Sequence, residues 1–182
     1  MKNNTKILTL NSILLAIGLL LHQITPALGL PMQPDLALIM LFTIIILNKD
    51  NYKMCLVAGI VTGIFTALTT KFPAGQLPNI IDKFITVNII FLLVYLLYKL
   101  SFIKKVKEKK QDIIVLLVIL PLGTFISGCV FLGSAQILVG LPGSFYSLFM
   151  VAVAPAILIN LVVGLFLFKI VQSCMKKISY KI

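Results

Sequence analysis

The chain has 182 residues, of which 60% are hydrophobic and 12% are charged, and its mean hydropathy is +1.11. A water-soluble domain is excluded, because too few polar side chains remain to cover its surface. The formal net charge of +11 would suit nucleic-acid binding, but the lysines gather at the ends of apolar runs and arginine is absent.

The apolar runs predict an all-α membrane protein. Membrane β-strands alternate apolar and polar residues, whereas runs such as 89–97 and 113–120 do not alternate. We expect a single domain over residues 1–182 with six transmembrane helices. The second helix is short for a span and is expected to be tilted little or partly re-entrant. In chain order the helices cover residues 7–25, 35–47, 54–70, 79–100, 112–136 and 145–171.

The lysines predict the orientation in the membrane. With six helices, 14 of the 16 lysines fall at the two termini and in the loops near residues 48–53 and 99–110. Loops rich in lysine remain in the cytoplasm, so both termini are expected there, in a multi-pass protein of the cell membrane. Lys71 and Lys83 fall on the outer side and need another explanation.

Residues 59–84 contain most of the distinctive local sequence. Gly59, Gly63 and Ala67 recur every four residues, a spacing that allows another helix to approach closely. Residues 72–78 then form a loop rich in turn residues. We interpret the loop as a lid over a site that opens to the outside.

Asp82 and Lys83 are the leading candidates for substrate binding. Asp82, three residues after Asn79, resembles a capping box, and an acid suits the first turn of a helix. A lysine in that turn opposes the helix dipole, although its side chain could extend to the lipid headgroups. Alternatively, the two charges hold the amine and the carboxylate of an amino acid through charge-assisted bonds, with Lys83 on the carboxylate and Asp82 on the amine.

Three other polar residues near the outer side are weaker candidates. Gln76 and Asn79 can donate and accept, and so suit a carboxylate or an indole N–H, but polar residues in an outer loop need no ligand. Asp35 either caps the helix that it opens or joins the site. His22 is either a site residue or bonds a backbone carbonyl.

Two polar residues in the last two predicted helices complete the candidate site. Gln136 shares a face with Cys129 and Gly133, which leaves room for a flat ring or for close helix packing. Asn160 lies well inside a helix, where a polar side chain is costly and binds either a ligand or a neighbouring helix. An indole ring would lie among apolar side chains of the fourth to sixth helices.

Catalytic and metal chemistry are not expected. Cys55, Cys129 and Cys174 lie in or beside apolar runs and are interpreted as small core residues. Nucleotide-binding and zinc-binding motifs are absent from the sequence. The pair Ser127-Gly128 lacks the Gly-x-Ser-Gly spacing of intramembrane serine proteases. The single histidine, His22, lies near the end of the first predicted helix, far from Ser127 in the sequence. No enzyme, no metal and no cofactor in this chain are therefore predicted.

Four segments carry a recognisable sequence. In chain order they read LLLHQITPALGLPMQPDLALIM, GIVTGIFTALTTKFPAGQLPNIIDKF, SGCVFLGSAQILVGLPGSF and VAPAILIN. Together they resemble the tryptophan-specific S-component family of energy-coupling factor transporters. The run FPAGQ-x-PN-x-IDK is the most specific part, and the basic loop and tail carry no family signal.

The resemblance implies a six-helix substrate-binding subunit with both termini inside. Such a subunit binds tryptophan at an outward-facing site and docks on a transmembrane coupling subunit, which two ATPase subunits drive. The family docks through an Ala-xxx-Ala pair on the first helix, and here the matching residues are Ser12 and Ala16. ATP would be used by the partners. The substrate-binding residues come from residue chemistry and not from the resemblance.

Three rival functions remain open. An S-component for another small ligand, such as a vitamin, would share the architecture, and a competition panel would distinguish it. A self-sufficient secondary amino-acid carrier would transport without ATP or partners. A structural membrane subunit would bind no ligand, and the polar outer loop argues against that interpretation.

Overall fold

The computed structural model describes residues 2–26 and 33–177, and no strand occurs in these ranges. The all-helical fold class is therefore confirmed for the described part of the chain. Residues 27–32 of the predicted outer loop and Lys181 of the tail lie outside it. The helices are α1 (Lys2–Ile24), α2 (Ala37–Leu47), α3 (Tyr52–Leu68), α4 (Gln76–Lys99), α5 (Ser101–Lys104), α6 (Glu108–Leu138), α7 (Phe145–Leu148), the π-helix η1 (Phe149–Val153) and α8 (Ala154–Lys177).

Four helical segments of the described chain are long and apolar enough to cross a membrane. They are Thr5–Ile24, Gln76–Lys99, Lys110–Leu138 and Phe145–Lys176. The apolar helices α2 and α3 are shorter than a full span. The predicted segments are largely helical, but their ends shift by up to six residues, and the basic loop contains the short helix α5.

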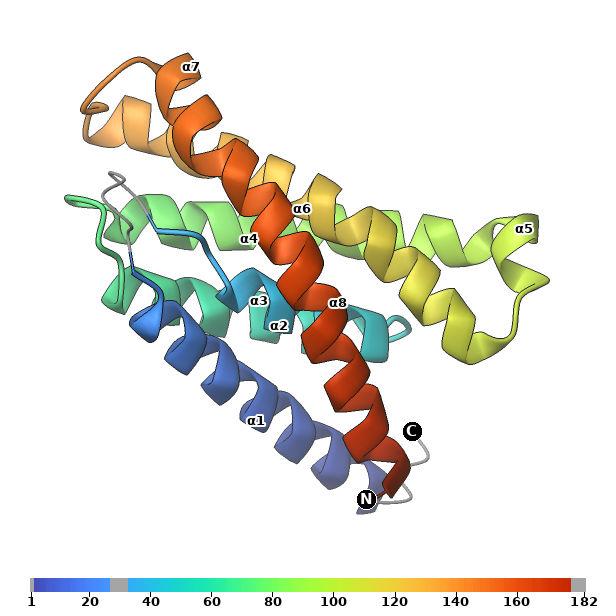
Figure 1. Ribbon diagram of the computed structural model, residues 1–182. Coiled ribbons are helices and arrows are strands. Elements are labelled where there is room, and N and C mark those ends of the chain that lie inside the picture. Colours follow the sequence, from blue (N-terminus) through green and yellow to red (C-terminus); the bar gives the residue numbers. More distant parts are fainter. Residues whose placement is uncertain (1, 27–32, 178–182) are drawn as a thin grey trace.

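The short helix α2 lies in the centre of the bundle. Every residue from Ala37 to Ile46 is buried, and the helix contacts α1, α3, α4, α6 and α8. The apolar surface of a helix is covered by other helices or by lipid, and around α2 it is covered by the helices that α2 contacts. Figure 1 shows α2 in this central position.

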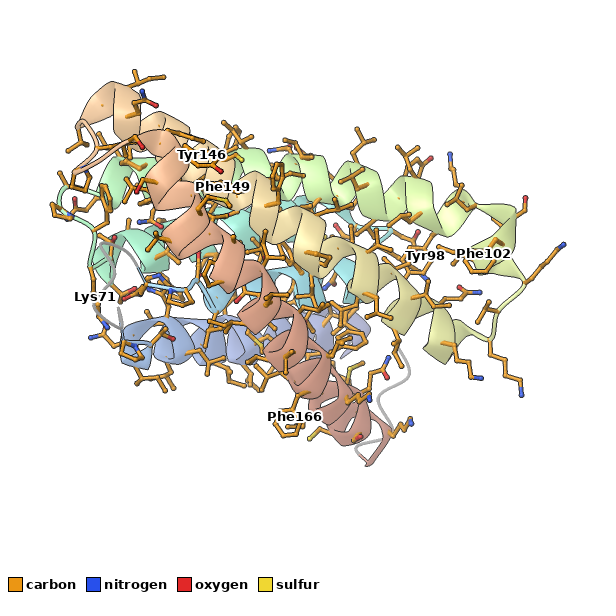
Figure 2. The ribbon with its side chains drawn as sticks, turned by 45° about the horizontal axis from the view of Figure 1, so that its top comes forward. Lys71, Tyr98, Phe102, Tyr146, Phe149 and Phe166 are labelled. Atoms are coloured by element: carbon orange, nitrogen blue, oxygen red, sulfur yellow. The ribbon has the colours of Figure 1, made fainter. Side chains whose placement is uncertain are left out.

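The two ends of the bundle differ in the segments that they carry. Figure 1 shows the last turn of α1, the loop between α3 and α4 and the loop between α6 and α7 together at the left of the view. The first turn of α1 and the last turn of α8 lie near each other, away from these loops. Figure 2 places Lys71 at the same left end, with Tyr98 and Phe102 at the opposite end. The predicted outer loops therefore meet at one end.

Helices α3 and α4 approach closely along the predicted small-residue stripe. A Cβ on Gly59 would lie 2.6 Å from Val87 Cβ, and one on Gly63 would lie 3.3 Å from Lys83 Cβ. Ala67 is also buried. The prediction of close packing at this stripe is confirmed.

Gly59→Ala is expected to lower the free energy of unfolding by about 1–3 kcal/mol, because Val87 is branched at Cβ and cannot move aside without shifting α4. Gly133→Ala is the matched control, since a Cβ added there would meet no atom of the described residues within 4 Å and alanine favours a helix. Thermal unfolding of both variants in detergent checks the prediction. Equal midpoints for the two variants would contradict it.

The last predicted helix, 145–171, is not a regular α-helix at its start. Residues 149–153 form a π-helix, and Ala154 N–H bonds the carbonyl of Phe149, five residues earlier. The widened turn comes directly before Pro155, whose ring lacks an N–H and crowds the preceding turn. The turn presses Val153 against α6, where a Cβ on Gly128 would lie 2.4 Å from Val153 Cγ1.

Candidate functional site

A cavity opens at the end of the bundle where the predicted outer loops meet. Its empty volume is about 550 Å³, a figure that includes space open to solvent. Residues of α1, α2, α4, α6, η1 and α8 line it, together with the segments before α2 and between α3 and α4. Its walls differ in chemistry: one is polar and charged, and the other is apolar.

Lys83 is the centre of the polar wall. Only 1% of the residue is exposed, and its Nζ lies 2.6 Å from Asp35 Oδ2 and also bonds Asp82 Oδ2. Asp82 accepts two further bonds at 2.8 Å, from the hydroxyls of Thr86 and Ser127. With all three groups ionised, two carboxylates face one ammonium, so this cluster has one excess negative charge.

The structure corrects the simpler interpretations of Asp82 and Lys83. Helix α4 begins at Gln76, three residues earlier than predicted, because Gly75 is its N-cap. Asn79 donates to the carbonyl of Gly75 at 2.8 Å, and Asp82 lies in the second turn, where it caps nothing. The capping interpretation of Asp82 is wrong, and so is the extension of Lys83 to the headgroups, because its side chain is buried.

Asp35 bonds the start of α2 and also lines the cavity. Its Oδ1 accepts a bond of 3.0 Å from the backbone N–H of Ala37, the first residue of α2, while its Oδ2 pairs with Lys83. Both contacts favour the ionised form of the Asp35 carboxyl group.

His22 and Gln33 extend the polar wall beyond the charged cluster. His22 Nδ1 lies 2.6 Å from the hydroxyl of Thr69, and Gln33 Nε2 donates to the carbonyl of His22 at 2.9 Å. His22 Nε2 lies 4.0 Å from Asp35 Oδ1. The ring thus bonds a side-chain hydroxyl and not the backbone carbonyl considered for it. The sequence analysis did not identify Gln33 as a site residue. The one feature that could have indicated it is its position two residues before Asp35.

Lys71, the other lysine on the predicted outer side, is exposed at the cavity. Its ammonium donates to the carbonyl of Thr25, which follows the last residue of α1 (Figure 2). The bond ties the loop between α3 and α4 to the end of α1. Both exceptions to the lysine pattern therefore have specific partners at the cavity.

Another part of the lining is apolar and partly aromatic. Phe72 and Phe131 meet edge to face, with ring centroids 5.3 Å apart and an interplanar angle of 86°. Gly128, Val153 and Ala156 continue this wall from α6, η1 and α8. The prediction that the fourth to sixth helices surround an indole is refined, because the α4 residues of the cavity are polar.

The structure brings only some of the predicted residues together. Asp35, Asn79, Asp82 and Lys83 line the cavity, whereas Gln76 and Gln136 are exposed and are not part of its lining. Asn160 is completely buried, and its amide donates to Thr124 Oγ1 at 3.1 Å and to the carbonyl of Asp35 at 3.3 Å. Asn160 therefore supports two lining residues from behind.

Two further predictions can be placed in the structure. Ser12 and Ala16 lie on an exposed face of α1, and the Ser12 hydroxyl donates to the carbonyl of Leu8 in the same helix. Within the described ranges, no group of three or more His, Cys, Asp or Glu side chains could hold a metal ion.

Comparison with known proteins relates the chain to tryptophan transport. The family model described as "Tryptophan transporter TrpP" matches residues 4–176. A probable tryptophan transport protein of Clostridium perfringens is 53% identical over 178 residues, covering 98% of this chain and 97% of that protein. Proteins of the same description from Clostridium acetobutylicum and Bacillus subtilis are 46% and 42% identical, each over 97% of this chain and over 97% and 96% of their own lengths. No solved structure is significantly similar.

Proposed function

Because the chain belongs to the tryptophan transporter family, and is thus a multi-pass membrane transport protein and not an enzyme, we propose that it imports tryptophan as the substrate-binding subunit of an energy-coupling factor transporter. One observation carries the substrate assignment. The lining of the cavity combines a charged cluster with apolar and aromatic side chains. A zwitterion with an aromatic side chain presents the same two chemistries.

The charged cluster supplies complementary groups for both ends of the amino acid. An ammonium group has three N–H donors, and Lys83 uses two of them on Asp35 and Asp82. Its third N–H is unused by the described residues and is proposed to bind the substrate carboxylate. The excess negative charge of the cluster is proposed to attract the substrate ammonium.

Asp35 is a better partner for the substrate ammonium than Asp82. Asp82 already accepts bonds from Lys83, Thr86 and Ser127. Asp35 accepts from Lys83 and from one backbone N–H, and its side chain is 17% exposed. We therefore assign the ammonium to Asp35, with Asp82 holding Lys83 in place and Asn79 on the same wall.

The proposed mechanism requires partner subunits. In this mechanism the chain spans the membrane six times with both termini in the cytoplasm, and it loads tryptophan at the outer end. The exposed Ser12–Ala16 face of α1 docks on a transmembrane coupling subunit, and two ATPase subunits supply the energy. The sequence contains no nucleotide-binding motif, which is consistent with ATP being used by the partners.

Binding and uptake test the two parts of the proposal separately. Calorimetry on the purified wild type is expected to detect tryptophan binding, and phenylalanine, tyrosine and a panel of vitamins are expected to compete poorly. In vesicles, uptake of labelled tryptophan is expected only when the coupling subunit, both ATPases and ATP are present. Tighter binding of a vitamin would overturn the substrate, and uptake by the chain alone would make it a self-sufficient carrier.

A further inference from the structure

We propose that the side-chain carbonyl of Gln33 binds the ammonium group of the substrate beside Asp35, and so helps to select a free amino acid. This inference rests on the proposed function. It concerns a residue that joins the site only through the fold, because Gln33 lies ahead of α2 and its amide reaches back to His22, 11 residues earlier in the chain.

The hydrogen bonds around His22 determine how the Gln33 amide is oriented. The Thr69 hydroxyl donates its one proton to the carbonyl of Phe65 at 2.7 Å, so its oxygen accepts from His22 Nδ1–H. In this tautomer Nε2 is an acceptor. Gln33 Nε2 lies 3.0 Å from both ring nitrogens of His22 and donates to the backbone carbonyl of His22 at 2.9 Å. Reversing the amide would set its oxygen against that carbonyl.

The orientation leaves the Gln33 carbonyl oxygen as an acceptor. Gln33 is 8% exposed and lines the cavity, and its Oε1 is buried without a hydrogen-bond partner among the described residues. A buried acceptor without a donor is costly, so it points to a donor on the ligand. Asn160 Oδ1 is also buried without a hydrogen-bond partner among the described residues, but Asn160 is not part of the cavity lining.

The charge around Gln33 favours an ammonium group as that donor. Tryptophan has two kinds of N–H donor, the ammonium and the indole. Gln33 and Asp35 both adjoin His22 Nε2, at 3.0 Å and 4.0 Å, and Asp35 belongs to the cluster with excess negative charge. An ammonium can bond the carboxylate and the carbonyl together, whereas the indole belongs on the wall of Phe72 and Phe131.

The test compares two substitutions and two ligands. Gln33→Met and Gln33→Glu both remove the amide protons that hold His22, but only Gln33→Met removes the acceptor. Gln33→Met is expected to weaken tryptophan binding about tenfold, equivalent to about 1.4 kcal/mol. Gln33→Glu keeps an acceptor but sets an oxygen against the His22 carbonyl, so it is expected to weaken binding by a smaller factor. The second ligand is 3-benzothienylalanine, which keeps the ammonium and replaces the indole N–H by sulfur. Gln33→Met is expected to weaken it by the same factor.

Any other result of this experiment would contradict a specific part of the inference. A loss for tryptophan that disappears with 3-benzothienylalanine would assign Gln33 to the indole N–H, and equal losses in both variants would assign it to holding His22. Unchanged affinity in Gln33→Met would also overturn the inference while leaving tryptophan binding intact. If the wild type binds neither ligand, the proposed function itself fails.

Discussion

Lys83→Met is expected to abolish measurable tryptophan binding and to destabilise the protein. The substitution leaves the carboxylates of Asp35 and Asp82 facing each other in a buried site without their shared cation. Removing one partner of a buried ion pair costs about 3–5 kcal/mol. Calorimetry and thermal unfolding in detergent measure the two effects. Lys53→Met is the control, because Lys53 is exposed at the start of α3, and it is expected to match the wild type in both.

A double variant separates the structural role of Lys83 from its role in binding. Lys83→Met with Asp82→Asn leaves Asp35 as the one charge of the cluster, so the net charge of −1 is restored. Most of the lost stability is expected to return, because no carboxylate pair remains. Tryptophan affinity is expected to stay at least about 30-fold below the wild type, since the donor for the substrate carboxylate is still missing. Affinity equal to the wild type would show that Lys83 is structural only.

Ala16→Leu is expected to reduce tryptophan uptake at least about tenfold while leaving tryptophan binding unchanged. Ala16 lies one turn from Ser12 on an exposed face of α1, and three added carbons would hold a docked helix away from that face. The cavity is lined by His22 near the end of the helix, and Ala16 is not among its residues. Uptake in vesicles with all partner subunits, together with calorimetry on the isolated chain, checks both expectations.

The matched control for this prediction adds bulk to a different exposed helix. Val162→Leu changes a residue of α8 that is 69% exposed. It is expected to leave both uptake and binding unchanged, because lipid tolerates another apolar side chain. Equal loss of uptake in the two variants would indicate a general effect on insertion, and unchanged uptake in Ala16→Leu would remove this face from the proposed docking surface.

The sequence predicted the structure best where a feature depends on only one helix and the helix packed against it. The Gly59–Gly63 stripe predicted close packing, and Val87 and Lys83 of α4 do pack there. It was least informative at helix starts. The loop before α4 was expected to run to Asn79, but Gly75 caps the helix and α4 begins at Gln76. Moving the start by one turn took Asp82 from a capping position to a buried one.

The membership of the site depended on distant segments. Asp35 lies 48 residues before Lys83, and no pattern in the sequence indicates that they form an ion pair. Gln76 was a candidate because its amide can both donate and accept, yet it is exposed, while Asn79 lines the cavity. Gln76 is the first residue of α4, whereas Asn79, one turn further along, is buried, so closeness in sequence did not select the lining residues.

Composition and local spacing were enough to predict an all-helical membrane protein and the helix that packs through small residues. These properties are local, because they follow from hydropathy and from the four-residue spacing of a helix. The central position of α2, which brings Asp35 to Lys83, emerged only in the folded bundle, as did the turn of Gln33 toward His22. Ion pairs and hydrogen bonds between distant segments depend on how the helices pack around α2, and packing is a property of the whole bundle.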